Sequence, residues 1–261
     1  MLTDCHVHIE KGDYTPAWIE RFIETAAEKN IDEIWLLEHC YFFREFVRMY
    51  DKLRQASAYL DGWFARKAGT RNFGDYLRLA DQIRARKYPI KIKFGLEVCY
   101  FKEHEELAYS ATKDARLDFL VGSVHFIENF AYDHGQNNEW NGIDADWAYE
   151  RYFEIADDLA ESGIYSGLAH PDLLKLFGHR PSYPLQPLYD RLAAVLGKSE
   201  MYAEQSSGAF RRCPVTCGPG MDTGLIAALK RRGVKIQTAS DAHSPEEVGY
   251  YIKEMSEMLK S

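Results

Sequence analysis

The chain has 261 residues, and 46% of them are hydrophobic, so it is long and apolar enough for one domain of the size of an α/β barrel. Asp and Glu number 40 against 32 Lys and Arg, which gives a formal net charge of -8. Because such a chain has no overall positive field for a polyanion, we expect no nucleic-acid partner.

The sequence also favours a protein of the cytoplasm. It has no run of 18 apolar residues, and its first residues lack the basic and apolar segments of a signal peptide, so we expect no membrane partner. Its five cysteines are an odd number in a long chain without a secretory signal, which favours reduced thiols. Cys213 and Cys217 have a spacing that a metal site could use, but we expect two free loop thiols.

Apolar segments with strand character recur along the chain, and amphipathic segments separate them. The predicted strands cover residues 2–8, 33–38, 92–98, 118–124, 164–169, 199–204 and 234–239. Strands that alternate with helices predict an α/β fold with βαβ units, a parallel sheet and, at this strand number, a barrel-like closure. There is no internal repeat and no linker, so we expect a single domain over residues 1–261.

Two helix starts are well marked. Thr15 is the predicted N-cap of the first helix, with Pro16 at its first position. The apolar face of that helix is formed by Ile19, Phe22, Ile23 and Ala26. The last helix is predicted to begin with Ser244 as cap, Pro245 at its first position and Glu247 completing a capping box.

Residues 126–145 are polar, aromatic and poorly periodic, which is typical of a long loop over a strand end that binds a ligand. An acid in this loop, Glu128, Asp133 or Asp144, could meet an amino group of a substrate. The sequence does not choose among the three.

The residue types that carry chemistry gather at the predicted C-terminal ends of the strands, where parallel barrels build their sites. In chain order these residues are His6 and His8, His39, Glu97, His125, His170, Glu204 with Ser206 and Ser207, and Asp241 with His243. Residues two apart on a strand point to the same side, so His6 and His8 can bind one ion. Since imidazole and carboxylate ligands suit Zn, Mn or Fe, the pattern predicts a metal centre.

These motifs resemble the polymerase and histidinol phosphatase (PHP) superfamily and, within it, the histidinol-phosphatase branch. The resemblance covers most of the chain and rests on DCHVH, EH at residues 38–39, GLEVCY, GSVHF, AHPDLLKLFG and SDAH, in this order. It implies a TIM-like, distorted seven-stranded β/α barrel of the PHP type, in agreement with the number of predicted strands.

The resemblance also implies a centre of two or three divalent ions, of Zn, Mn or Fe. It places a first ion on His6, His8, Glu97 and Asp241, a second on Glu97, His125 and His170, and a third on His39 and His243. Many family members have a further histidine several residues after the H-x-H pair, whereas this chain reads IEKGDYTP. We expect Glu10 to replace it, with Asp13 as a weaker substitute. An exposed acid at position 10 and a weak or empty third site are the alternatives.

Such a centre suits the hydrolysis of a small phosphorylated substrate. With three carboxylates, neutral histidines, three divalent ions and one hydroxide, the net charge is about +2, which complements a phosphate monoester dianion. The resemblance implies that a metal-bound hydroxide at Glu97, Asp241 and His243 is the nucleophile. We therefore expect a phosphomonoester hydrolase whose substrate is L-histidinol phosphate, an enzyme of histidine biosynthesis.

Phosphate contacts are expected from the segment after the sixth predicted strand. Guanidinium groups match phosphate oxygens, so Arg211 and Arg212, together with Ser206 and Ser207, are the candidates. The resembling branch usually has an E-x-N-T-x-G sequence here, whereas this chain has AEQSSG. Because residues of this segment are candidates for substrate contacts, the difference bears on which phosphomonoester the protein accepts.

Three other functions compete with this hypothesis. A PHP phosphoesterase for nucleotides would need a basic approach path, which the acidic chain does not offer. A non-catalytic PHP scaffold would have lost its ligands, whereas here the set is nearly complete. A two-metal amidohydrolase characteristically uses a lysine on a strand, and none of the predicted strand ends has one.

Overall fold

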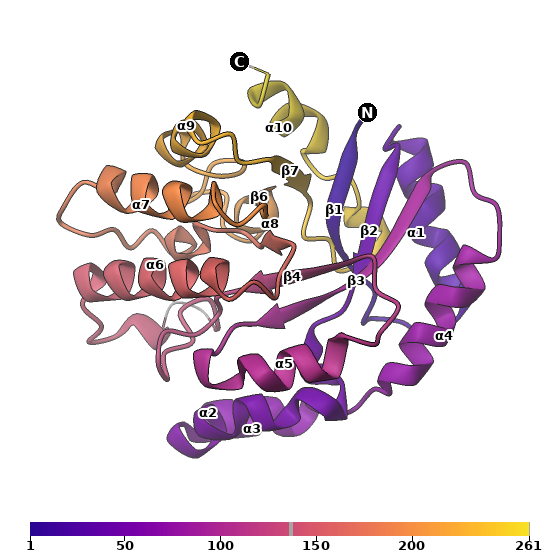
Figure 1. The fold of residues 1–261 in the computed structure, drawn as a ribbon, viewed down its shortest axis with the longest axis horizontal. Helices are drawn as coiled ribbons and strands as arrows, with labels where there is room; N and C mark the ends of the chain where they lie inside the picture. Colours follow the sequence, from indigo (N-terminus) through magenta and orange to yellow (C-terminus); the bar gives the residue numbers. More distant parts are fainter. Residues whose placement is uncertain (136–137, 261) are drawn as a thin grey trace.

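The computed structural model describes residues 1–135 and 138–260, and at its centre lies a parallel sheet of seven strands in chain order (Figure 1). The strands are β1 (Thr3–His8), β2 (Glu33–Leu37), β3 (Lys91–Cys99), β4 (Phe119–Ser123), β5 (Gly167–Leu168), β6 (Tyr202–Ser206) and β7 (Ile236–Ala239). The chain just after β7 returns to β1, where the amide of His8 donates to the carbonyl of Ala242 over 2.7 Å. The predicted distorted seven-stranded barrel is therefore confirmed.

Ten α-helices and six short 3₁₀ segments connect the strands in the described residues. The α-helices are α1 (Pro16–Glu28), α2 (Asp51–Ala56), α3 (Ala58–Lys67), α4 (Phe73–Arg84), α5 (Glu105–Thr112), α6 (Ala145–Glu161), α7 (Gln186–Leu196), α8 (Gly208–Arg212), α9 (Thr223–Arg231) and α10 (Ile252–Met258). The 3₁₀ segments are η1 (Cys40–Phe42), η2 (Arg44–Tyr50), η3 (Lys102–His104), η4 (Asn138–Trp140), η5 (Leu173–Lys175) and η6 (Pro245–Glu247).

The helices cover the barrel unevenly. In Figure 1, α6, α7 and α9 stack along one side of the sheet, and α1 and α4 cover the opposite side. The connection between β2 and β3 is longer than one crossover helix needs, and its helices α2 and α3 lie beside α5 at the edge of the molecule. This extra helical segment contributes to the cavity described below.

The first helix begins as predicted, and the last does not. The hydroxyl of Thr15 accepts from the amide of Trp18, Pro16 is the first residue of α1, and the predicted apolar face is buried. Near the C-terminus, Pro245 starts only the single turn η6, and the Ser244 side chain makes no capping bond. Glu247 accepts from the amide of His243 instead, so the predicted capping box is wrong and α10 begins only at Ile252.

An apolar plug fills the barrel interior. It consists of Cys5, Trp35, Leu37, Phe119, Val121, Ala169, Tyr202 and Ala239, all buried. Trp35 is its centre, with ring centroids 4.9 Å from Phe119 and 5.3 Å from Tyr202. On each contributing strand these residues precede the polar residues of the strand end. The polar residues of the strand ends therefore lie together at one end of the barrel, beyond the plug.

The described residues of the segment 126–145 form a layer over that end rather than a purely polar loop. Phe126, Phe130, Tyr132 and Trp140 are buried, and the indole of Trp140 donates to the carbonyl of Tyr132. Residues 136–137 of this predicted loop lie outside the described residues. The buried aromatic side chains fix the position of the polar residues that lie between them.

The structure also bears on the cysteines and on the helices. None of the five cysteines forms a disulfide in the described structure, so Cys213 and Cys217 are free thiols. No described helix combines the length and the apolar character that crossing a membrane requires.

Candidate metal centre

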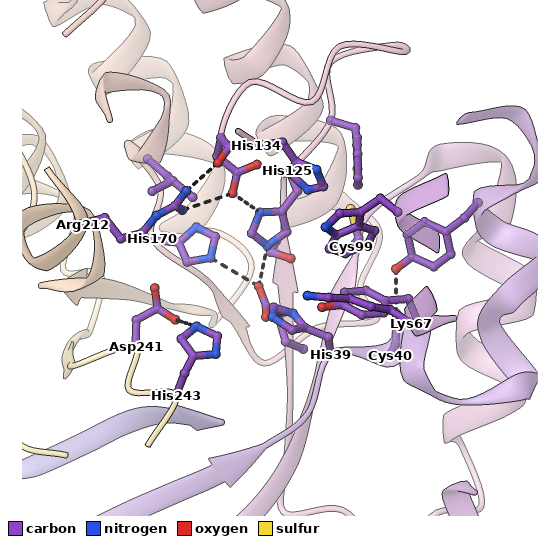
Figure 2. Close-up of a pocket in the computed structure, with 18 of the residues that line it drawn as sticks. His39, Cys40, Lys67, Cys99, His125, His134, His170, Arg212, Asp241 and His243 are labelled. Carbon is purple, nitrogen blue, oxygen red and sulfur yellow. Dashed lines mark hydrogen bonds and ion pairs between the residues drawn. The ribbon is translucent and has the colours of Figure 1, made fainter. Parts of the chain in front are cut away.

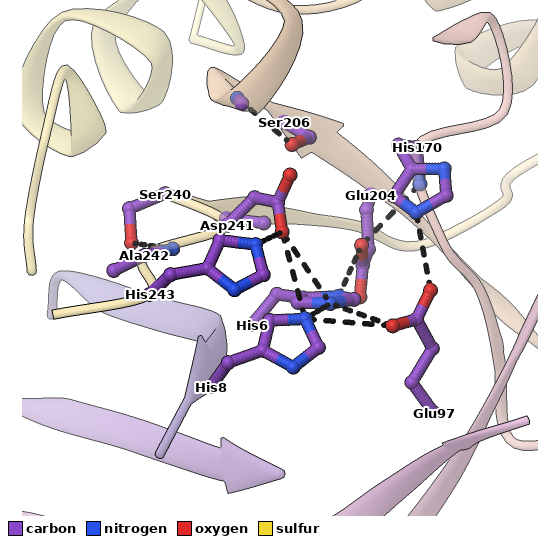
Figure 3. Close-up of polar contacts among 12 residues, drawn as sticks. His6, His8, Glu97, His170, Glu204, Ser206, Ser240, Asp241, Ala242 and His243 are labelled. Carbon is purple, nitrogen blue, oxygen red and sulfur yellow. Dashed lines mark hydrogen bonds and ion pairs between the residues drawn. The ribbon is translucent and has the colours of Figure 1, made fainter. Parts of the chain in front are cut away.

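All six histidines predicted at strand ends converge with two carboxylates at the open end of the barrel (Figures 2 and 3). We call this group the cluster. Its members are His6 and His8 of β1, His39 after β2, Glu97 of β3, His125 after β4, His170 after β5, and Asp241 and His243 after β7. The segments that carry them are up to 237 residues apart in sequence, and the closed sheet brings their ends together.

Glu97 is the hub of the cluster, because five imidazoles lie within 4 Å of its carboxylate. The distances from its oxygens are 2.7 Å to Nδ1 of His39, 2.8 Å to Nε2 of His125, 3.3 Å to Nε2 of His170, 3.4 Å to Nε2 of His8 and 3.6 Å to Nε2 of His6. Glu97 is 1% exposed. Burial raises the pKa of Glu97, but the nearby imidazoles of His39 and His125 lower it by more. The pKa therefore lies well below its usual range.

Asp241 completes the other side of the cluster (Figure 3). Its Oδ1 lies 3.5 to 3.8 Å from the Nε2 atoms of His6, His8 and His243. The backbone of Asp241 is left-handed, with φ of 54°, and its carboxylate packs directly on Gly208. A Cβ at position 208 would overlap this carboxylate, so the start of α8 needs a glycine there.

The donor atoms fit divalent ions. Three groups of ligand atoms lie within 4.8 Å of one another: His6, His8 and Glu97; His39, Glu97 and His125; and His8, His39 and His243. The Nε2 atoms of His6 and His8 are 2.9 Å apart. Among the described residues no Lys or Arg lies within 4 Å of the buried Glu97 carboxylate, and converging imidazole nitrogens take that place. Imidazoles around a shared carboxylate are the ligands that Zn, Mn or Fe prefer.

Three acids contact the opposite nitrogens of cluster histidines. Glu204 lies 3.0 Å from Nδ1 of His6, and Asp133 lies 3.0 Å from Nδ1 of His125. Such contacts fix the tautomer and the orientation of a metal-binding imidazole. The sequence placed Glu204 at a strand end and Asp133 in the 126–145 loop, but it gave neither this role.

Glu10 is the third of these acids. Its Oε1 lies 2.6 Å from Nδ1 of His243, and its Oε2 lies 4.0 Å from Nδ1 of His8. The Nε2 atoms of the same two histidines face Asp241. Glu10 therefore approaches the two rings from the side away from Asp241, which favours an orienting role. Direct metal binding by Glu10 stays a prediction, and the weaker substitute Asp13 forms no contact with the cluster in the described structure.

The predicted phosphate contacts have mixed positions. Arg211 and Arg212 line the cavity, but both guanidinium groups are engaged with protein. Arg211 donates to the carbonyl of Asp241 and pairs with Glu247 at 2.6 Å, and Arg212 donates to the carbonyl of Asp133. Arginine contacts with substrate stay a prediction.

Ser206 and Ser207 are not in the described cavity wall. The Ser207 hydroxyl is buried and donates to the carbonyl of Tyr250 over 2.8 Å. The Ser206 hydroxyl accepts from the amide of Gly208 at the start of α8. Both hydroxyls thus bond to the backbone, and substrate contacts by the two serines stay a prediction.

A cavity of about 360 Å³ opens over the cluster (Figure 2). Its outer wall is aromatic and includes Tyr41, Tyr59, Trp63 and Phe126, with His134 of the 126–145 loop against Trp63 at 4.7 Å. Lys67 at the end of α3 also lines it. The sequence did not indicate α3 as part of the site, because its residues carry no recognisable motif.

Of the acids proposed for a substrate amino group, only Asp133 lines the cavity. Its carboxylate is already engaged by His125, and Arg212 lies 3.7 Å away. Glu128 pairs with Arg151, and Asp144 caps α6. These two acids are therefore not part of the described cavity wall.

Comparison with known proteins points to the same family as the sequence motifs. The profile of the PHP domain matches residues 4–207. A curated protein named "Probable histidinol-phosphatase" from Deinococcus radiodurans is 27% identical over 162 residues, which cover 62% of this chain and 61% of that protein. One of the same name from Schizosaccharomyces pombe is 25% identical over 195 residues, which cover 69% of this chain and 62% of that protein. The chain thus matches about three fifths of the length of each relative.

Two solved structures share the fold. The histidinol phosphate phosphatase of Lactococcus lactis, complexed with zinc, L-histidinol and phosphate, aligns with a TM-score of 0.73 at 19% identity, over 99% of this chain and 92% of that chain. A structure described as a histidinol phosphatase candidate from Listeria monocytogenes aligns with a TM-score of 0.75 at 16% identity, over 96% and 99% of the two chains. With the family profile covering most of the chain and the cluster at the ends of its strands, the protein belongs to the PHP domain family.

Proposed function

We propose that this protein is a metal-dependent phosphomonoesterase that hydrolyses L-histidinol phosphate to L-histidinol and phosphate. The observation that carries the proposal is the buried Glu97 carboxylate, which five imidazoles surround at the floor of a cavity. The names of the two curated relatives and the L-histidinol and phosphate in the Lactococcus structure support this choice of substrate. Such an enzyme serves histidine biosynthesis, and we propose that it acts in the cytoplasm as one domain over residues 1–261.

The cluster would hold two or three ions of Zn, Mn or Fe. We assign a first position to His6, His8, Glu97 and Asp241, a second to Glu97, His125 and His170, and a third to His39 and His243 with Glu10 as a ligand or as the orienting acid. Divalent ions held there would supply a nucleophile at neutral pH and positive charge for the phosphate dianion.

The chain's own residues prepare the site for that chemistry. Glu204 and Asp133 hold a proton on Nδ1 of His6 and His125, which leaves the Nε2 lone pairs to face the cluster. The aromatic wall offers ring faces to the leaving group, and an imidazole ring is flat enough to stack on such a wall. Arg211 keeps the Asp241 segment in place through its bonds to that backbone and to Glu247.

Phosphate release from a panel of substrates tests the proposal. Protein reconstituted with Zn, Mn or Fe is assayed with L-histidinol phosphate, mononucleotides, sugar phosphates and an aryl phosphate. We expect a strong preference for L-histidinol phosphate, loss of activity with a chelator and its recovery on addition of metal. Glu97→Gln should be inactive, whereas His104→Asn, a change outside the cluster, should keep wild-type activity. Metal-loaded protein that releases phosphate from no monoester contradicts the proposal, and preference for a mononucleotide replaces its substrate.

A further inference from the structure

One lysine and two arginines line the described part of the cavity, and their contacts differ. Arg211 is bonded to the Asp241 carbonyl and to Glu247, and Arg212 to the Asp133 carbonyl. These guanidinium groups hold the walls of the site together. The third cation is Lys67, the last residue of α3.

Lys67 reaches the cavity without an acidic partner. Its Nζ lies 4.5 Å from the centre of the Trp63 ring, and within the described residues no carboxylate lies within 4 Å of it. The side chain is half-buried. Burial lowers the pKa of Lys67, and Glu10 raises it in part. A ring face attracts an ammonium group but does not neutralise it, so the charge of Lys67 stays available to an anion.

The position of Lys67 relative to the cluster is fixed by the structure around it. Just beyond α3, the amides of Gly69 and Arg71 donate to the carbonyls of Tyr41 and Phe42, in the segment that directly follows His39. A series of rings makes the same connection, since the ring of Tyr41 stacks on His39 at 4.9 Å and meets Trp63 edge-on at 5.1 Å. Backbone bonds and ring contacts therefore tie α3 to a cluster histidine.

We propose that Lys67 binds the phosphoryl group of the substrate from the α3 side of the cavity. This inference rests on the proposed function and adds a specificity-determining residue to it. A phosphate monoester dianion has three non-bridging oxygens, and an ammonium group binds such an oxygen as a point charge. Trp63 holds the ammonium at the cavity wall while no substrate is bound. Selection for a doubly charged phosphoryl group then comes from α3 as well as from the cluster.

Binding of inorganic phosphate to the zinc-loaded protein tests Lys67 without turnover. Isothermal titration calorimetry compares wild type with Lys67→Gln, Lys67→Arg and the control Arg66→Gln, which removes a charge from the exposed neighbouring residue of α3. We expect Lys67→Gln to weaken phosphate binding about tenfold, the loss of one charge-assisted hydrogen bond. Lys67→Arg should keep most of the affinity, and Arg66→Gln should bind as wild type. Zinc content should be equal in all four proteins.

Kinetics with L-histidinol phosphate separate this inference from the proposed function. For Lys67→Gln we expect a higher KM and a lower kcat/KM, with recovery in Lys67→Arg. Unchanged phosphate affinity in Lys67→Gln overturns the inference, and so does a loss of zinc from that variant or a wild-type protein that binds no phosphate. Phosphate binding that depends on Lys67, in a protein that does not hydrolyse L-histidinol phosphate, supports the inference and rejects only the proposed function.

Discussion

Glu204, Asp133 and Glu10 each contact Nδ1 of a different histidine of the cluster, while Nε2 of the same ring faces Glu97 or Asp241. An imidazole can bind a metal only through a nitrogen that carries no proton. A carboxylate on Nδ1 retains the proton there, so each acid determines which nitrogen is available. At the residue scale, the site is therefore built from pairs of an acid and a histidine as much as from ligands.

Replacing Glu204 with Gln tests this pairing. The amide keeps the size of the side chain but loses the charge that holds the Nδ1 proton of His6. We expect zinc affinity to fall about tenfold to a hundredfold, measured by competition with a chromophoric chelator. Glu33→Gln is the matched control, because Glu33 is also buried on a strand but lies at the opposite end of the barrel, where it binds Trp35 and Lys93. Equal zinc affinity in wild type and Glu204→Gln would remove Glu204 from the site.

The metal-free protein should respond strongly to pH. Burial lowers the pKa of His125, but Asp133 and Glu97 raise it, to about 10. Burial also lowers the pKa of His243, but Asp241 and Glu10 raise it, to about 9. Without metal, both imidazoles are therefore protonated on both nitrogens at pH 7.5, and metal binding must release the Nε2 proton of each. Burial lowers the pKa of His6 too, but the Glu204 and Glu97 carboxylates hold it well above its usual range. We expect metal affinity to fall as the pH falls, with at least two protons released per centre.

Two measurements check this pH dependence. Calorimetry of zinc binding in buffers of different ionisation enthalpy counts the protons, and a binding enthalpy that does not vary with the buffer would contradict the prediction.

The raised pKa values also stabilise the metal-free fold at pH values below about 6.5, where an unfolded histidine is protonated as well. That stabilisation is lost as the pH rises through 9 and 10. Urea unfolding of the metal-free protein should show a decrease in stability over this range.

The residues of the cluster could be predicted from sequence, whereas the orienting role of their acidic partners could not. His6 and His8 share one strand, and Asp241 and His243 share the short segment after another, so the strand pattern alone placed them at one end of the barrel. Asp133 lies in a loop without periodicity, and its contact with His125 depends on how buried aromatic residues fold that loop. Lys67 was missed for a similar reason, since helix α3 carries no motif and only its packing on Tyr41 brings it to the site.

At the element scale, strands were easier to predict than the segments between them. Every predicted strand range overlaps an observed strand, because buried parallel strands are nearly continuous apolar runs. β5 has only two residues, Gly167 and Leu168, although six were predicted. Apolar content does not reveal how many residues pair with a neighbour, and Gly167 packs so closely on Tyr202 that no side chain fits between them.

The segment after β7 shows why the predicted C-terminal helix start was wrong. Ser244, Pro245 and Glu247 have the spacing of a capping box, but Glu247 is shared between the His243 amide and Arg211. Its contacts are therefore used to fix the ligand segment rather than to begin a helix. A local signal was overridden by tertiary contacts at the site, where such departures are expected.

At the scale of the whole molecule, the barrel is closed by β1 and β7, the first and last strands of the sheet. The hydroxyl of Thr238 donates to the carbonyl of Thr3, and the amides of Ser240 and Gly249 donate to the two carboxylate oxygens of Asp4. Asp4 is fully buried. The segment between Ser240 and Gly249 carries Asp241 and His243, so the closure of the barrel and the completion of the cluster depend on the same carboxylate.

Asp4→Ala should therefore weaken both the fold and the metal centre. The change removes the acceptor, now at 2.8 Å, of one buried and one partly buried amide donor, at a cost of about 2 to 4 kcal/mol in the free energy of unfolding. Asp4→Asn keeps the volume but turns an amide NH₂ toward one donor, so it should lose stability too. Asp32→Ala is the control, because the Asp32 carboxylate is exposed, accepts from the amide of Leu2 and lies 3.9 Å from the N-terminal ammonium group. Urea unfolding measures stability, and zinc content reports on the cluster.

Wild-type stability in Asp4→Ala would show that the barrel closes without this carboxylate. A stable variant that has lost zinc would restrict the role of Asp4 to positioning the segment that carries Asp241.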